Sequence, residues 1–123
     1  MTDIGKIYSS SDADSQFGAV NESVNFKSND LINLLNETTE YLMFRVMNSQ
    51  PQILDNNRNP LYPDGLIISN SDVFTVFSIS LITELLADGN EALTYFENRQ
   101  SVFTLTNGNY TLEQGQICPP YCS

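Results

Sequence analysis

The feature of this sequence that most restricts its fold is a pair of short amphipathic segments. Leucine and isoleucine side chains recur at helical spacing over residues 31–35, and they do so again over residues 81–86. Ser28 offers an N-cap before the first segment, which predicts a helix over about 28–39. Each helix has a single apolar stripe that must be buried against another layer, so neither helix folds as an independent unit.

Segments with strand character surround both predicted helices. Tyr41 to Met47 is apolar or bulky throughout apart from Arg45, which is typical of a central strand buried on both faces. The dipeptide Asn107-Gly108 is a strong hairpin signal. The other segments with strand character are 17–26, 53–54, 73–77, 93–97 and 102–106.

The two halves of the chain follow one pattern of strand, helix, strand and strand. In the alignment that suits both helices, Phe26 falls on Val76, and the pseudo-repeats span 17–65 and 66–115. A chance match between two ordinary amphipathic patterns is the alternative. We expect an α+β domain in which both halves share one mainly antiparallel sheet with the two short helices on one face. This layout is ferredoxin-like, or else profilin-like or PAS-like.

The two ends of the chain differ in composition from the single domain expected at 17–117. Residues 1–16 are polar and rich in Ser and Asp, which predicts a flexible acidic arm or an edge addition. Residues 118–123 form a tail that holds both cysteines, Cys118 and Cys122, around a stiff Pro-Pro pair.

Three uses of the cysteine tail are open. The two thiols could form a local disulfide that acts as a structural clip, supply half of a metal site, or act in redox chemistry or cross-linking between subunits. Structural zinc generally needs four Cys or His ligands, and the chain has no His, so a zinc site needs the tails of two subunits. The spacing from Cys118 to Cys122 is one residue longer than in a Cys-x-x-Cys redox motif.

The charge balance restricts the class of partner. The sequence has 15 acidic residues against 5 basic ones, a net charge of −10, and no basic patch can be assembled from so few cations. Nucleic acids and anionic membrane surfaces are therefore not expected as partners. We expect a second copy of the chain as a partner, because the predicted strands carry few of the charges that protect sheet edges. A basic protein surface is the other expected partner, because the net charge of the chain is negative.

The sequence offers little that indicates transport or membrane insertion. No basic segment followed by an apolar run stands at the N-terminus, and no apolar stretch approaches the roughly 18 residues of a membrane span. We expect a cytoplasmic protein, unless a processed segment precedes this sequence.

One strand carries a row of polar groups that could bind a ligand. Alternation places Tyr95, Glu97 and Arg99 on the same face of the strand that begins at Leu93. A phenol, a carboxylate and a guanidinium in a row could hold a polar ligand, with Arg45 as a further anchor. The alternative is a cross-strand ladder of ion pairs on a solvated face.

Catalytic motifs do not appear in the sequence. Without His there is no Ser-His-Asp or Cys-His arrangement, and the six glycines never cluster into a phosphate-binding loop. No cofactor is expected. The sequence favours a non-enzymatic protein-interaction or assembly module that is homo-oligomeric. The alternatives are a small-ligand binder or small enzyme with a pocket between sheet and helices, and a thiol-dependent metal or redox device at the C-terminus.

Overall fold

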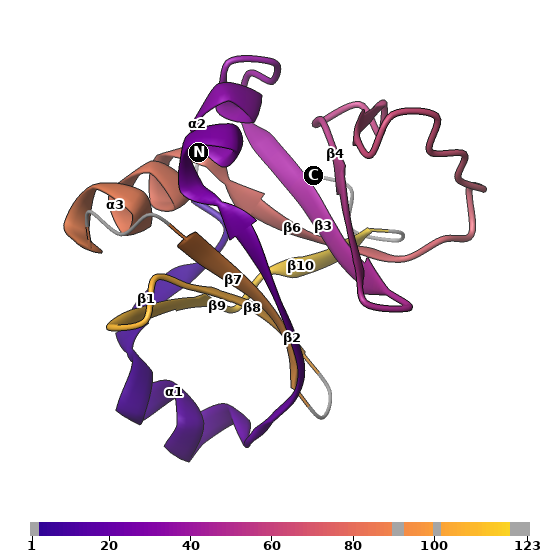
Figure 1. Ribbon diagram of the computed structural model, residues 1–123. Helices are drawn as coiled ribbons and strands as arrows, with labels where there is room; N and C mark the ends of the chain where they lie inside the picture. The colour runs from indigo at the N-terminus through magenta and orange to yellow at the C-terminus, as the bar shows by residue number, and fades with distance from the viewer. Residues whose placement is uncertain (1–2, 90–92, 100–101, 119–123) are drawn as a thin grey trace.

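The computed structural model describes residues 3–89, 93–99 and 102–118, and it is an α+β structure with two antiparallel sheets. Figure 1 shows the sheets with α2 (Ser28–Leu35) and α3 (Ile79–Gly89) on one side and α1 (Ser10–Phe17) at the opposite end. Sheet A has the order β1-β9-β8-β7-β2 and sheet B the order β10-β6-β3-β4-β5. The strands of sheet A are β1 (Lys6–Ser9), β9 (Tyr110–Glu113), β8 (Phe103–Thr106), β7 (Leu93–Arg99) and β2 (Val20–Lys27). The strands of sheet B are β10 (Gln116–Cys118), β6 (Phe74–Ser78), β3 (Tyr41–Met47), β4 (Gln50–Leu54) and β5 (Pro60–Tyr62).

The expectation of one shared sheet is wrong, because the strand before each helix pairs with the strand after the other helix. β2 pairs with β7 in sheet A, and β6 pairs with β3 in sheet B. Each helix therefore leads the chain from one sheet into the other, and the two sheets face each other across a common core. The predicted central strand is confirmed, since β3 lies in the middle of sheet B and is buried on both faces at Leu42 and Met43.

The order of elements from β2 to β5 recurs from β6 to β9, but the aligned residues differ from those expected. Phe26 and Phe77 each lie two residues before the first residue of a helix and face the same core. Val76, which the sequence alignment placed on Phe26, faces the opposite side of sheet B. The structural correspondence is thus shifted by one residue, because a single-residue shift in a strand exchanges its two faces. The duplication itself stays a prediction.

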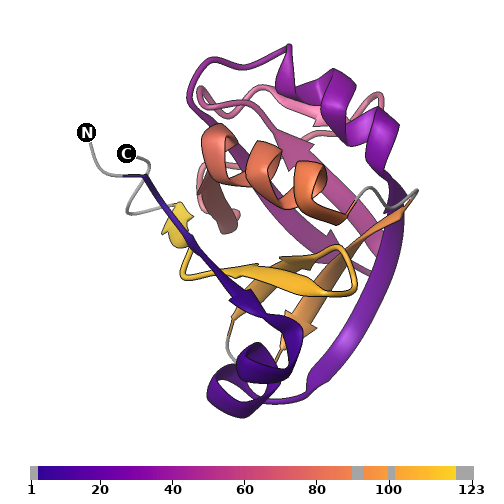
Figure 2. The ribbon, with the colours of Figure 1, turned by 90° about the vertical axis from the view of Figure 1, so that its left-hand side faces the viewer.

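Two smaller expectations also change. The helix predicted over about 28–39 is α2, which ends at Leu35. Ser28 does not act as its N-cap. The Ser28 hydroxyl instead hydrogen-bonds Thr94 Oγ1 at 2.8 Å inside the core. Over its described residues, the segment 1–16, expected as a flexible arm or an edge addition, is an edge addition rather than a free arm, since it supplies β1, which pairs with β9 at the edge of sheet A, and most of α1. Figure 2 shows this strand running beside β9.

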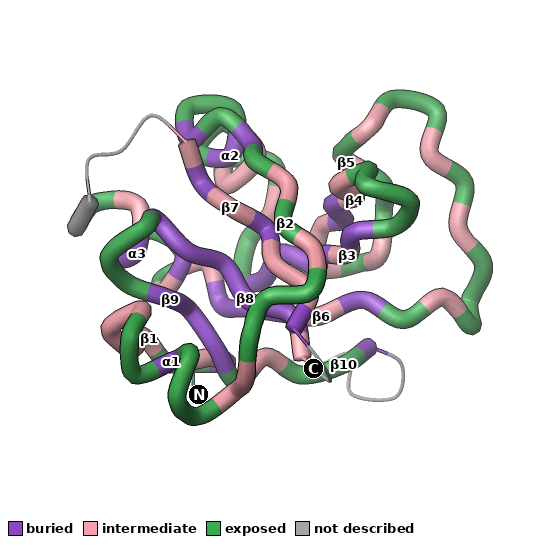
Figure 3. Tube along the Cα trace, turned by 60° about the horizontal axis from the view of Figure 1, so that its bottom comes forward, coloured by how far each residue is buried: buried purple, intermediate pink, exposed green. Residues whose placement is uncertain are grey.

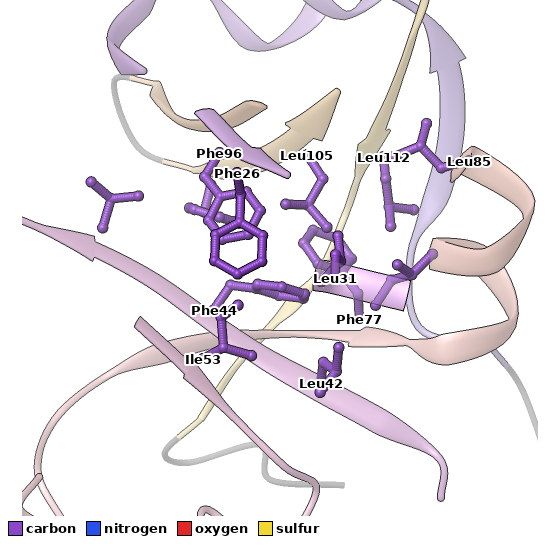
Figure 4. Packing of buried hydrophobic residues seen from close by; sticks show 13 residues of the cluster. Phe26, Leu31, Leu42, Phe44, Ile53, Phe77, Leu85, Phe96, Leu105 and Leu112 are labelled. Atoms are coloured by element: carbon purple, nitrogen blue, oxygen red, sulfur yellow. The ribbon is translucent and has the colours of Figure 1, made fainter. Parts of the chain in front are cut away.

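The main core lies between the two sheets and under α2 and α3. Phe44 of sheet B meets Phe96 of sheet A edge-to-face with ring centroids 5.3 Å apart, and Phe103 stacks on Phe44 at 5.9 Å. Figure 4 shows Phe44 and Phe96 converging from the two sheets, with Leu31 of α2 and Leu85 of α3 in the same cluster. The buried residues of the main core are Phe26, Leu31, Leu42, Phe44, Val46, Ile53, Phe77, Ile82, Leu85, Phe96, Phe103, Leu105 and Leu112.

A second, smaller core covers the other face of sheet B. Leu66 and Ile68, from the long segment between β5 and β6, pack there against buried side chains of the sheet. Figure 3 shows this segment as a mostly exposed loop. Gly115 lets the chain pass from β9 to β10, because a Cβ atom there would lie 2.5 Å from Thr75 Cγ2 and 2.9 Å from the Val76 carbonyl oxygen.

The main core predicts a large difference between two apolar truncations. Phe96→Ala should lower the free energy of unfolding by about 3–5 kcal/mol, because it leaves a cavity where both sheets meet. Ile67→Ala, at a side chain that is 90% exposed, should change it by less than about 0.5 kcal/mol. Urea unfolding followed by circular dichroism measures both. Equal effects would contradict this description of the core.

Candidate functional site

The predicted ligand residues of β7 lie together on the outer face of sheet A, away from the main core. Tyr95 is paired with Thr106, and Glu97 with Thr104, in the register of β7 with β8. Phe96, between them, points into the core. Arg99 Nη2 donates to Glu97 Oε1 at 3.2 Å, so the carboxylate and the guanidinium of the predicted row are in direct contact.

Arg99 is buried and serves as an anchor for α1. Its guanidinium donates through Nη1 to Asp14 Oδ1 at 2.8 Å and to the Gly18 carbonyl oxygen, and through Nε to Thr104 Oγ1 at 3.3 Å. Only 2% of the side chain is exposed. The guanidinium of Arg99 is therefore held by α1, Glu97 and Thr104, while Tyr95 and Glu97 are only partly buried.

Glu113 is the residue of this site that the sequence reasoning missed. It lies on β9, and one side-chain oxygen, Oε1, accepts a hydrogen bond from the Gln114 backbone N–H at 3.1 Å. The other oxygen, Oε2, is buried and has no hydrogen-bond partner among the described residues. The alternation of the predicted hairpin was a usable signal, because Leu112 in the core places Glu113 on the face that holds Glu97.

The environment of Glu113 favours its protonated form. Burial raises the pKa of this carboxyl, and the negative charge of Glu97 raises it further. The Gln114 N–H and the Arg99 guanidinium lower it, but burial is the largest of these effects. Glu113 thus combines a buried carboxyl, an unused oxygen and a pKa above its ordinary value, and such groups are concentrated at functional sites.

Arg45 is not brought to the β7 row. It lies on sheet B, on the face turned away from the main core, where Nε and Nη2 donate to Gln52 Oε1 at 2.9 and 2.7 Å. Its guanidinium stacks over the Phe74 ring at 4.5 Å and lies 3.6 Å from Asp72 Oδ1. The Ser69 backbone N–H and Arg45 lower the pKa of Asp72. Arg45 therefore stabilises the long segment that covers sheet B.

Cys118 ends β10 and is buried in the second core as a disulfide cysteine. Arg58 Nη1 donates to its carbonyl oxygen at 3.1 Å and contacts its Sγ at 3.4 Å. Cys122 lies outside the described residues. Within the described ranges, no three Cys, Asp or Glu side chains are arranged to hold a metal ion.

A groove about 440 Å³ in volume runs between α2 and α3 on the outside of the molecule. Its walls are mostly apolar, and Ile32 is 44% exposed there. The lining residues are Ile32, Leu35, Asn36, Thr83, Leu86 and Ala87. A second groove of about 480 Å³ lies on the other side of α3, lined by Ile7, Glu84, Leu85, Ala87 and Tyr110. The exposed side of α3 is thus bordered by apolar surface on both flanks.

The comparisons with known proteins add no assignment: no family model, curated protein or solved structure matches the chain. No helix of the described ranges combines the length and the apolar character needed to cross a membrane.

The raised pKa of Glu113 predicts that this residue lowers the free energy of unfolding more at high pH than at low pH. Because its pKa is higher in the folded chain than its ordinary value of 4.5, the carboxyl favours the folded state at low pH and this advantage is lost as the pH rises. Each unit by which the pKa is raised corresponds to about 1.4 kcal/mol at high pH. Glu113→Gln should therefore gain stability relative to the wild type as the pH increases from 4 to 8.

The measurement is urea unfolding of both proteins across that pH range. The difference between the two curves isolates Glu113 from the other acidic residues, which are common to both. A difference that stays constant with pH, or that changes in the opposite direction, would show that the Glu113 carboxyl is not destabilised by burial.

Proposed function

We propose that this chain is a non-enzymatic protein-interaction module that binds a basic, amphipathic segment of a partner protein in the groove between α2 and α3. The observation that carries the proposal is an apolar groove between two helices that carry exposed acidic residues on or next to them. Grooves between helices are a common docking place for amphipathic helices, whose apolar side chains enter the groove.

The apolar part of the surface is sufficient for anchoring. Ile32 is nearly half exposed on α2, while Leu35 and Leu86 are partly buried and form the groove walls. Covering apolar surface contributes about 25 cal/mol per Å², so two or three anchoring side chains from a partner supply several kcal/mol.

The charges carried by the two helices and their flanking residues select the partner. Asp30, Glu37 and Glu84 are exposed on or next to the two helices. The described part of α3 has no Lys or Arg, and Lys27, just before α2, is the one cation near α2 in the sequence. A second copy of this chain would bring the same carboxylates against each other, whereas a Lys- or Arg-rich segment would be attracted.

A synthetic peptide pair tests this proposal. A helical peptide with Leu at every third and fourth position and Lys elsewhere should shift the backbone amide signals of Ile32, Leu35, Thr83 and Leu86 in NMR titrations. A peptide with the same Leu pattern and Glu in place of Lys should not bind. Binding should weaken with added salt, because exposed charges are screened over about 10 Å at 0.1 M.

The matched variants are Ile32→Ser and Ile67→Ser, which remove exposed isoleucines inside and outside the groove. Ile32→Ser should weaken binding of the Lys peptide about ten-fold, the equivalent of ~1.4 kcal/mol of lost apolar contact. Ile67→Ser should leave it unchanged. Equal weakening by both variants, or amide shifts spread over the whole acidic surface, would refute a groove-specific interaction.

Homodimerisation is a second candidate, and it is favoured by the open edge of β2. This strand has eight residues, pairs only with β7 among the described strands, and carries just Glu22 and Lys27 as charges. Long edge strands with few charges readily add a strand from another chain. The pairing uses a different surface from the α2–α3 groove.

Light scattering at micromolar concentration should report twice the chain mass of 13.8 kDa. The double variant Ser23→Lys with Asn25→Lys should return the protein to a monomer, because antiparallel pairing of two β2 strands would bring like charges together. Thr39→Lys, at an exposed position outside the strands, serves as the control for added charge. A wild-type monomer would exclude this dimer.

A further inference from the structure

A pocket of about 380 Å³ lies where the end of β7 and the start of β8 approach the bend between β9 and β10. It is separate from the two grooves beside α3, since it shares no lining residue with them. Its lining residues are Thr75, Asn98, Arg99, Val102, Phe103, Glu113, Gln114, Gly115 and Ile117. The pocket therefore combines apolar walls with the buried carboxyl of Glu113.

Glu113 differs from the other residues of this pocket because one of its buried oxygens has no hydrogen-bond partner among the described residues. The residue is 1% exposed, and the oxygen concerned is Oε2. Leaving a buried polar atom without a partner costs about 1–3 kcal/mol, and more for a charged group. Native structures contain few such atoms. A ligand that donates a hydrogen bond to Oε2 would remove this cost.

The charges around Glu113 decide the sign of that ligand. Arg99 also lines the pocket, but its guanidinium already donates to Asp14 and Glu97. Its positive charge is thus neutralised, and the three carboxylates of Glu113, Glu97 and Asp14 outnumber the two cations Arg99 and Lys6, so their net charge is negative when all are ionised. An anionic ligand is disfavoured for this reason. A metal ion is also disfavoured, because the described residues do not bring three suitable ligands together.

We propose that this pocket binds a primary ammonium group carried on a short apolar stem, with Glu113 Oε2 as the acceptor. Val102, Phe103 and Ile117 supply apolar walls for the stem. Asn98 also lines the pocket, and its Nδ2 donates to Glu22 Oε1 and to the Val46 carbonyl oxygen. The ammonium belongs either to a free aliphatic amine or to a lysine side chain of a protein.

Binding of the ammonium is coupled to ionisation of Glu113. The charged groups around this carboxyl are Glu97 and Arg99 on β7, Asp14 on α1, and Lys6, which stands opposite Glu113 in the register of β1 with β9. An ammonium favours the ionised carboxylate, so affinity should rise as the pH increases from 5 to 8. Alkylammonium groups keep their proton throughout this range.

The test is an NMR titration of the full chain with pentylamine, with 1-pentanol and pentanoate as neutral and anionic analogues of the same length. Pentylamine should give saturable shifts at the amides of Phe103, Gln114 and Gly115, and the two analogues should not. A lysine derivative with blocked backbone groups is the second probe. Binding of both amines indicates a lysine side chain as a possible source, whereas binding of pentylamine alone indicates a free amine, and either result supports the ammonium site.

Two charge-matched variants separate the pocket from the general acidity of the protein. Glu113→Gln should weaken pentylamine binding at least ten-fold and remove its pH dependence, while Glu84→Gln, at an exposed carboxylate on α3 and outside this pocket, should leave both unchanged. Ile117→Ala, at a wall residue that is 49% exposed, should weaken pentylamine more than methylamine. Equal binding of 1-pentanol, unchanged binding in Glu113→Gln, or equal losses in both glutamate variants would overturn the proposal.

Discussion

The contact between the two sheets in the main core is the interaction on which the rest of the structure depends. Phe44 and Phe96 come from strands that belong to different sheets, and they meet at the centre of the molecule. Because each helix connects a strand of one sheet to a strand of the other, the sheets cannot separate without exposing the apolar stripes of α2 and α3. Strand pairing and helix packing therefore form one cooperative unit, as is usual for a domain of this size.

The outer face of sheet A differs from the main core in the kind of interaction that stabilises it. It is held by polar contacts, in which Ser10, Thr106 and Thr111 share hydroxyl hydrogen bonds and Arg99 ties the end of α1 to β7. Buried charges are tolerated only where they are paired, and Arg99 meets this requirement with two carboxylates. Glu113 Oε2 has no such partner among the described residues, and this distinguishes the Glu113 pocket from the rest of the face.

The two proposed binding surfaces use the acidic character of the chain in different ways. At the α2–α3 groove, the helices that supply the apolar walls also carry exposed carboxylates, so charge guides a partner while apolar contact holds it. At the Glu113 pocket, a single buried carboxyl supplies the specificity, because burial makes its electrostatic interactions stronger than those of a surface group. Both surfaces favour cations, in agreement with a sequence that has 15 acidic and 5 basic residues.

The sequence by itself determined the two helices with apolar stripes, the central strand, the last hairpin and the sign of the charge. Local periodicity predicted the central strand at 41–47, the hairpin at Asn107-Gly108 and both main helical stripes, because these features depend on neighbouring residues alone. Only the tertiary structure decided which strands pair, and pairing moved half of the strands into a second sheet. It also decided that Arg45 and Arg99 lie on different sheets and that Glu113 is buried. Burial and pairing depend on residues far apart in the chain, so they leave no local pattern in the sequence.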